Sequence, residues 1–260
     1  MIATFPQKIN YGFRSIVHTA KKIPRHPLTA LIKEIIFPLD CPICGAHLLS
    51  QNEAVNGICN SCALYFNVEP ELRCEICGKP LISEIKVCVS CRKAEEKPAF
   101  NGAFVIYPYT GVYQKLLTAY KFENHRPLAH FFAEKLIQIA SDIPALLQEE
   151  WVWVPTPPQP KKIKEKGWDQ VEEIARVLEN KSEKKVERVL KRLASRSQKE
   201  LNRENRLLNL KGRILTVKRP PRNVILFDDV FTTGSTVNVC AQALKAGGAE
   251  NVFAMCLFYD

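Results

Sequence analysis

The stretch that decides the fold spans residues 224–236 and reads VILFDDVFTTGST. Its apolar start predicts a buried strand over 223–227, and two adjacent acids follow at the end of that strand. A loop of threonine, glycine and serine comes next, and a helix is predicted over about 236–245. After Gly247 and Gly248, residues 251–258 predict another strand. This strand, loop, helix and strand form a β-α-β unit, which indicates a parallel sheet with right-handed crossovers.

The loop of this stretch has the composition of a phosphate cradle. Backbone N–H groups at the start of a helix favour a dianion, and Gly234 lets the backbone approach it closely. Hydroxyl donors are supplied by Thr232, Thr233, Ser235 and Thr236. Asp228 and Asp229 then stand where a sugar bound by its phosphate would place its hydroxyls, or where Mg²⁺ would bind. The alternative interpretation of the two acids is a helix cap.

Strands also alternate with helices upstream of this unit. Apolar runs predict strands over 104–107 and 151–154, the second of them ended by a proline-rich turn at 155–158. Helical spacing is found over 111–121, 128–140 and 169–178. The expected fold class is therefore α/β, with a parallel sheet flanked by helices.

Eight of the ten cysteines form an internal repeat of Cys-x-x-Cys pairs with a period of 33 residues. The pairs are Cys41 and Cys44, Cys59 and Cys62, Cys74 and Cys77, and Cys88 and Cys91. Two such turns bind one zinc ion with four thiolates, so the repeat predicts two structural zinc sites with no position open for water. Either sequential or crossed pairing of the turns satisfies the spacing. Cys240 and Cys256 lie in apolar segments and are expected in the core.

Composition limits the class of protein. The chain has 260 residues, of which 46% are hydrophobic, and 37 Lys and Arg against 27 Asp and Glu, a net charge of +10. This composition excludes disorder over the whole length, and the basic excess suits a polyanionic partner. No apolar run reaches the ~18 residues of a membrane span, and no secretory signal is recognised, so a cytoplasmic protein is expected.

We expect three regions along the chain. Residues 1–40 form a basic lead-in whose segment 31–37 has the spacing of a short amphipathic helix stopped at Pro38. Residues 41–98 form a double zinc ribbon, and a charged linker ends it. Residues 99–260 carry the α/β domain.

The stretch 224–236 resembles the PRPP-binding signature of type I phosphoribosyltransferases, where PRPP is 5-phosphoribosyl 1-pyrophosphate. The segments WVPTP at 153–157, KGWDQ at 166–170 and QKELNRENRLLN at 198–209 are similar to blocks of the ComF competence-protein family. Lys121 and the cysteine-rich front fit the same family, and the resemblance covers about residues 31–260. Two positions depart from it, since Asp169 replaces the usual asparagine and Ser195 the usual threonine.

The resemblance implies a PRPP site with Mg²⁺. Asp228 and Asp229 would be the catalytic residues near the ribose hydroxyls, and residues 232–236 would surround the 5′-phosphate. Loss of pyrophosphate needs cations to neutralise the leaving group. Candidate pyrophosphate or lid contacts are Lys161, Lys162, Lys166, Arg192, Arg196, Gln198 and Arg206, with Arg192 and Arg196 expected in a polar loop that folds over the ligand. The alternative for these basic residues is a solvated surface.

The resemblance also implies a role in DNA uptake during natural transformation. The chain would handle single-stranded DNA in the cytoplasm together with a helicase or another DNA-uptake protein. Tyr65, Phe66 and Tyr107 would suit stacking on bases, or else belong to the core. Two alternatives remain: a housekeeping phosphoribosyltransferase acting on a nucleobase or an amine, and a non-catalytic PRPP- or DNA-binding module. An active enzyme would be a pentosyltransferase that uses PRPP.

Overall fold

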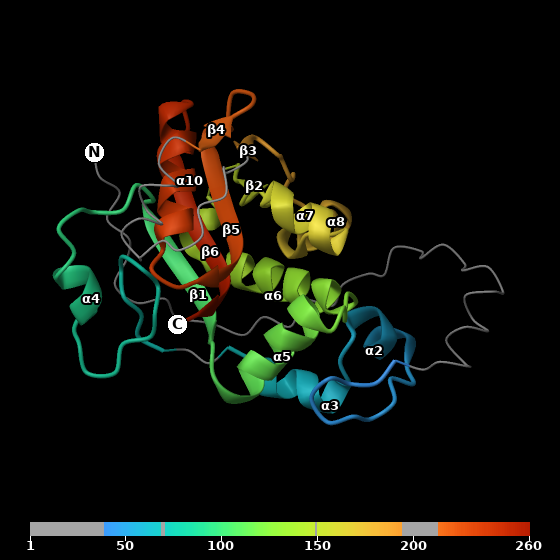
Figure 1. Ribbon diagram of the computed structural model, residues 1–260. Helices are drawn as coiled ribbons and strands as arrows, with labels where there is room; N and C mark the ends of the chain where they lie inside the picture. The colour runs from blue at the N-terminus through green and yellow to red at the C-terminus, as the bar shows by residue number, and fades with distance from the viewer. Residues whose placement is uncertain (1–38, 69–70, 149, 194–212) are drawn as a thin grey trace.

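The computed structural model describes residues 39–68, 71–148, 150–193 and 213–260. In this part of the chain, four parallel strands form the central sheet in the order β1-β6-β5-β2. The strands are β1 (Gly102–Pro108), β2 (Val152–Pro155), β5 (Asn223–Phe231) and β6 (Asn251–Tyr259). Figure 1 shows α10 (Ser235–Ala246) on one side of this sheet and α6 (Leu128–Asp142) with α8 (Gln170–Lys181) on the other. The predicted α/β class is confirmed.

Alternation along the central strands explains why both faces are covered. Ile225 and Phe227 of β5 pack into the core shared with α6 and α8. Val224 and Leu226, one residue earlier in each case, pack into a second core shared with α10. A strand buried on both faces reads as a continuous apolar run, which is what residues 224–227 show.

The strand β5 is longer than its apolar run predicts. The acids were expected at the end of the strand, but Asp228 pairs with Cys256 of β6, and pairing continues through Phe231 and Tyr259. Strand β6 is buried along this length and continues beside β5 as far as Tyr259, so the ladder extends past the acids. Both acids therefore lie on a rigid strand at its carboxyl end.

The other helices and short elements fill the spaces around the sheet. They are α2 (Gln51–Asn56), α3 (Asn60–Ala63), η1 (Leu64–Phe66), α4 (Val89–Arg92), α5 (Gly111–Phe122), η2 (Pro144–Leu146), α7 (Pro160–Lys166), β3 (Leu190–Arg192) and β4 (Ile214–Thr216). The helices predicted over 111–121, 128–140 and 169–178 correspond to α5, α6 and α8. Helix α7 and the antiparallel pair of β3 and β4 were not predicted.

Arg192 is not in the polar loop where it was expected. It is the last residue of β3 and pairs with Ile214 of β4. The apolar residue Leu190 anchors β3 in the core shared with α10, so the segment is held as a strand. The remaining candidates of this region, Arg196, Gln198 and Arg206, together with the segment 1–38, lie outside the described residues.

The first zinc ribbon packs into the core of the α/β part. Phe66 is fully buried and meets the ring of Tyr107 edge to face, with 5.7 Å between centroids. The Tyr107 hydroxyl donates to the carbonyl of Phe66 at 2.7 Å. Both rings are buried, so of the two interpretations given for Phe66 and Tyr107 the structure supports the core and not stacking on bases. Tyr65, by contrast, is exposed.

Chain segments lie along both edges of the sheet. On β2, the N–H of Trp153 donates to the carbonyl of Lys185 at 2.9 Å. On β1, a guanidinium N–H of Arg73 donates to the carbonyl of Val105 at 2.6 Å, and the group lies over the Phe104 ring at 4.1 Å. The second ribbon, which carries Arg73, therefore covers the β1 edge. No described helix has both the length and the apolar character to cross a membrane.

Candidate functional site

A cavity of about 160 Å³ lies at the carboxyl ends of the neighbouring strands β2 and β5. Its walls include Thr156, Asp169, Arg192, Asp228, Asp229 and Thr236. In open parallel sheets this edge is where ligands bind, because loops and helix N-termini converge there. The structure thus brings together both acids, one of the loop hydroxyls and one of the predicted arginines.

Asp228 is a half-buried acid with a perturbed protonation equilibrium. Burial and the adjacent carboxylate of Asp229 raise its pKa to about 7, against the opposing effect of a hydrogen bond from Thr156. The Thr156 hydroxyl donates to Asp228 Oδ1 at 2.9 Å, and the N–H of Asp229 donates to the same oxygen at 2.9 Å. Asp228 therefore exchanges a proton near neutral pH in a fixed orientation.

Asp229 is held by an ion pair. The Nζ of Lys121, in the last turn of α5, lies 2.7 Å from Asp229 Oδ2, and both side chains are mostly buried. Lys166 donates to the Lys121 carbonyl at 3.1 Å and lies over the Phe122 ring at 4.7 Å. Lys166 thereby ties α7 to the end of α5 and is not part of the cavity wall, and its role as a pyrophosphate contact stays a prediction.

The predicted cradle begins α10. Gly234 has φ = 72°, a left-handed conformation that favours glycine, and a Cβ there would lie 2.5 Å from the Phe231 ring. The Thr233 and Ser235 hydroxyl oxygens are 2.5 Å apart. Thr236 lines the cavity, whereas Thr232 and Thr233 are exposed. The N-terminus of α10 is therefore presented at the edge of the cavity.

The basic candidates fall into two groups. Arg192 lines the cavity, and its partial burial lowers the guanidinium pKa while the Asp228 carboxyl opposes this change. Lys161 is exposed on α7 and pairs with Glu165 at 3.7 Å, so it has the solvated role of the alternative interpretation. Lys162 lies in α7, and its side chain is outside the described part of the structure.

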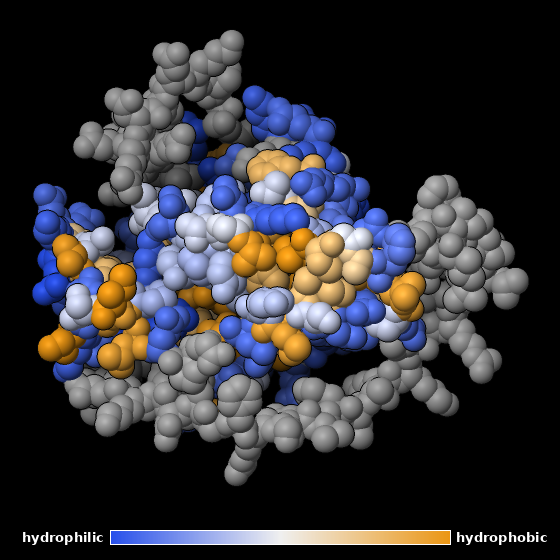
Figure 2. Space-filling model, turned by 90° about the horizontal axis from the view of Figure 1, so that it is seen from below, coloured by the Kyte–Doolittle hydropathy of each residue, from blue (hydrophilic) through white to orange (hydrophobic). Residues whose placement is uncertain are grey.

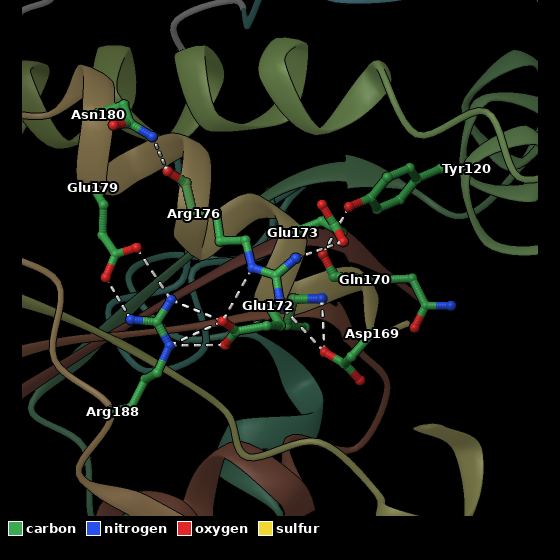
Figure 3. A network of polar contacts seen from close by, with 10 residues as sticks. Tyr120, Asp169, Gln170, Glu172, Glu173, Arg176, Glu179, Asn180 and Arg188 are labelled. Atoms are coloured by element: carbon green, nitrogen blue, oxygen red, sulfur yellow. Dashed lines mark hydrogen bonds and ion pairs between the residues drawn. The ribbon is translucent and has the colours of Figure 1, made fainter. Parts of the chain in front are cut away.

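Asp169 begins α8 and caps it. Its Oδ1 accepts from the N–H groups of Val171 and Glu172 at 3.0 Å each. Figure 3 shows Asp169 at the start of the helix, with the Tyr120 hydroxyl directed at the carbonyl of Gln170, to which it donates at 2.7 Å. Asparagine caps helices equally well, so the departure noted in the sequence preserves the local geometry. It adds an acid whose pKa is raised by burial and by Asp229.

Arg188, on the segment between α8 and β3, holds the chain that leads to Arg192 in place. The Arg188 guanidinium lies between two acids of α8, 2.8 Å from Glu172 and 2.5 Å from Glu179, as Figure 3 shows. Bidentate contacts of this kind define both position and orientation. The chain that leads into β3 is thereby attached to α8.

The roles of two residues of the site, Thr156 and Lys121, were not predicted from the sequence. Thr156 was noted as part of a proline-rich turn and of the WVPTP segment that carries the resemblance, and Lys121 was noted for the resemblance; neither was given a partner. Thr156 directly follows β2, and β2 lies beside β5, but that neighbourhood depends on strand order, which the sequence pattern leaves open. Lys121 reaches Asp229 from a different helix, so no local signal pairs them.

The cysteines form two separate clusters with the sequential pairing. Cys41, Cys44, Cys59 and Cys62 make one, and Cys74, Cys77, Cys88 and Cys91 make the other. Cys44 and Cys59 sulfurs are 3.7 Å apart, as are those of Cys77 and Cys88. Four sulfurs at about 2.3 Å from a tetrahedral zinc ion are about 3.8 Å from one another. The donor sets therefore fit two structural zinc ions, and crossed pairing is excluded.

Comparison with known proteins supports this organisation. A family model of the double zinc ribbon domain matches residues 32–92. Competence protein F of Haemophilus influenzae is 27% identical over 83% of this chain and 95% of its own length. The competence proteins ComFC of Bacillus subtilis and Streptococcus pneumoniae are each 25% identical, over 89% and 82% of this chain and 95% and 97% of their own lengths.

Proposed function

We propose that this chain, a relative of the ComF competence proteins over most of its length, binds PRPP with Mg²⁺ at the carboxyl ends of β2 and β5. One observation carries the proposal. Two strand-borne acids and a helix N-terminus opened by Gly234 border the same cavity. Carboxylates accept hydrogen bonds from the hydroxyls of a sugar, and the N–H groups at the start of a helix bind its phosphate. The two features together therefore fit a phosphorylated pentose.

The residues present define how such a ligand would lie. The N–H groups at the start of α10 and the Thr236 hydroxyl would bind the 5′-phosphate, while Asp228 and Asp229 would accept from the ribose hydroxyls. Carboxylates next to substrate phosphates are ligands that Mg²⁺ accepts, so the donor set fits this ion. When bound, Mg²⁺ would supply charge neutralisation of the pyrophosphate group.

The cations of the site support the pyrophosphate end of the ligand. Arg192 lies on the cavity wall, and its positive charge is opposite to that of the phosphates. Its guanidinium offers bidentate hydrogen bonds. Lys121 now pairs with Asp229, so a ligand that engages Asp229 would release a lysine ammonium beside the bound phosphates. Positioning and charge neutralisation are the main contributions to catalysis when a leaving group departs as an anion.

Calorimetric titration of PRPP and Mg²⁺ into the zinc-loaded protein tests the site. We expect micromolar binding that the double variant Asp228→Asn/Asp229→Asn loses. Asp142→Asn, an exposed acid at the end of α6, is the matched control and should bind as the parent does. If titration of PRPP into the folded wild-type protein gave no heat of binding, the proposal would be refuted.

We further propose that the site serves DNA uptake through handling of single-stranded DNA in the cytoplasm. The support is the similarity to proteins named for competence and the net charge of +10, which favours a polyanion. Fluorescence anisotropy with a labelled single strand should show binding that weakens steeply as salt rises. Absence of binding at low salt would remove this part of the proposal.

Pyrophosphate release distinguishes a transferase from a binding module. Release that depends on a nucleobase or an amine would favour the housekeeping transferase, and release that depends on single-stranded DNA would join the two proposals. Tight PRPP binding without release under either condition would assign a non-catalytic module.

A further inference from the structure

A larger cavity, with a volume of about 410 Å³, lies between the first zinc ribbon and α6. One wall comes from α2, α3 and the residues between and after them, and the other comes from α6, against which α2 packs (Figure 1). Among the described residues, none of those assigned above to PRPP or to zinc binding lines it. The cavity therefore calls for its own explanation.

Carboxamide side chains dominate the polar part of these walls. They are Asn52, Asn56, Asn60, Asn67 and Gln138. On the ribbon side, Asn56 donates to Asn52 and Asn52 donates to Asn60, each at 3.3 Å. A carboxamide offers two donors and an acceptor with two lone pairs, so these contacts use a part of its capacity. The amides that line the cavity therefore keep hydrogen-bonding capacity beyond these contacts.

The innermost carboxamide has an acceptor without a donor. Asn56 is only 8% exposed, and among the described residues none donates to its Oδ1. Buried acceptors are normally satisfied, and an unsatisfied one is unfavourable. Because Asn56 lies in the wall of a cavity, a donor of a bound molecule is positioned to complete it.

The charged residues of the cavity leave it close to neutral. Lys135 donates to Asn67 at 3.3 Å and to Gln138 at 3.5 Å, and burial lowers the pKa of its ammonium. Glu134 pairs with Lys181 at 2.5 Å. The lining therefore carries one cation and one anion, and Lys135 donates to amide oxygens of both walls.

Apart from the hydroxyl of Ser61, the rest of the lining is apolar and consists of Ile58, Ala63, Leu64 and Phe131. A ligand that fits must therefore present apolar faces together with an edge of donors and acceptors. A nucleobase has this shape, and asparagine and glutamine recognise base edges with paired hydrogen bonds. A sugar ring carries hydroxyls around its faces and matches apolar walls less well.

From these observations we propose that the amide-lined cavity between α2, α3 and α6 binds a nucleobase, either of a free nucleoside or of a single strand. The proposal does not depend on PRPP binding at the carboxyl ends of β2 and β5. It assigns the first zinc ribbon a recognition role in addition to its structural one.

Nuclear magnetic resonance of the zinc-loaded full chain gives a direct test. Titration with thymidine and with deoxyadenosine should shift the side-chain amide resonances of the lining carboxamides. The variant Asn52→Ala/Gln138→Ala removes one exposed amide from each wall, and we expect about tenfold weaker binding or more. The matched control Gln148→Ala/Asn180→Ala removes exposed amides elsewhere and should bind as the parent does.

A labelled oligonucleotide of six thymidines distinguishes the two sources of the base. Equal affinities for thymidine and the oligonucleotide would assign the site to free bases, and much tighter binding of the oligonucleotide, weakened in the same variant, would assign it to a strand. Nucleosides that leave these resonances unmoved in the wild-type protein would overturn the proposal. The proposal would also be overturned if glucose shifted these resonances and nucleosides did not. The same holds if the folded Asn52→Ala/Gln138→Ala variant bound nucleosides with the full wild-type affinity.

Discussion

The carboxyl group of Asp228 makes the stability of this protein depend on pH. Its pKa is raised from 3.8 to about 7 in the folded state, so the folded chain binds a proton that the unfolded chain releases between these values. Stability therefore falls as pH rises through this window. The full change in pKa would correspond to about 4 kcal/mol, and solvent screening of this half-buried carboxyl reduces the decrease in unfolding free energy that we expect between pH 4 and pH 8 to on the order of 1–2 kcal/mol.

The substitution Asp228→Asn should remove this decrease, because asparagine does not ionise and still accepts from Thr156. Urea denaturation at several pH values measures it. Glu96→Gln changes an exposed acid and should keep the wild-type dependence. An unchanged slope in Asp228→Asn would show that Asp228 is not the group responsible.

Arg192 and Lys161 should differ sharply in their effect on PRPP binding. Arg192 lines the cavity, whereas the Lys161 side chain is 81% exposed and pairs within α7. We expect Arg192→Gln to weaken PRPP binding at least tenfold, since a charge-assisted contact contributes about 1.5–3 kcal/mol. Lys161→Gln should bind within about twofold of the parent. Calorimetry compares the two, and the reverse order would contradict the assignment.

Single residues also show where sequence reasoning ends. The acids and the glycine of residues 224–236 could be assigned because each has a local chemical reason to be there. Thr156 and Lys121 acquire their roles only through strand order and helix placement, which local patterns do not specify. Asp169, noted as a departure, proves to be a helix cap.

The turn that begins α10 depends on glycine for two separable reasons. Gly234 has a left-handed backbone, and it also packs directly on Phe231. Gly167, at the end of α7, has φ = 74° but nothing within 4 Å of a Cβ built on it. Comparison of the two positions therefore isolates the effect of the contact.

We expect Gly167→Ala to lower the free energy of unfolding by about 1 kcal/mol from the backbone alone. Gly234→Ala should lower it by about 2–4 kcal/mol, because the ring must also move, and it should weaken phosphate binding. Chemical denaturation measures both. Equal losses at the two positions would mean that the Phe231 contact carries no cost.

Elements with strong periodicity were predictable, and those made by tertiary contacts were not. Helices α5, α6 and α8 follow their apolar spacing to within a few residues. The segment Pro160–Lys166 carries mostly lysine and so has little apolar spacing to predict its short helix, which contacts the end of α5 through Lys166. β3 and β4 have three residues each and are defined by their pairing with each other.

At the scale of the whole molecule, the two zinc ribbons and the α/β core should unfold together. Phe66 and Ile58 of the first ribbon share a core with Phe132 of α6 and Met255 of β6, and Cys74 and Cys77 of the second share one with α10. The boundary at residue 98 was predicted from composition, which does not report such shared packing.

Removal of both zinc ions by a chelator should lower the midpoint of thermal unfolding by about 10 °C or more, within a single transition. Scanning calorimetry checks this. The variant Cys59→Ser, which alters the first site, should reproduce part of the loss, and Cys240→Ser leaves both zinc sites intact as a control. Two transitions, one of them at the wild-type temperature, would contradict a shared core.

The Arg73 contact with β1 has a consequence for solubility. An uncovered edge strand presents unpaired N–H and C=O groups, and another chain can add to it. Strand β1 is apolar along its length, and the second ribbon covers it through the bond from Arg73 to Val105. The zinc ion that folds this ribbon thereby protects the sheet from intermolecular strand addition, and its loss would favour aggregation by way of β1.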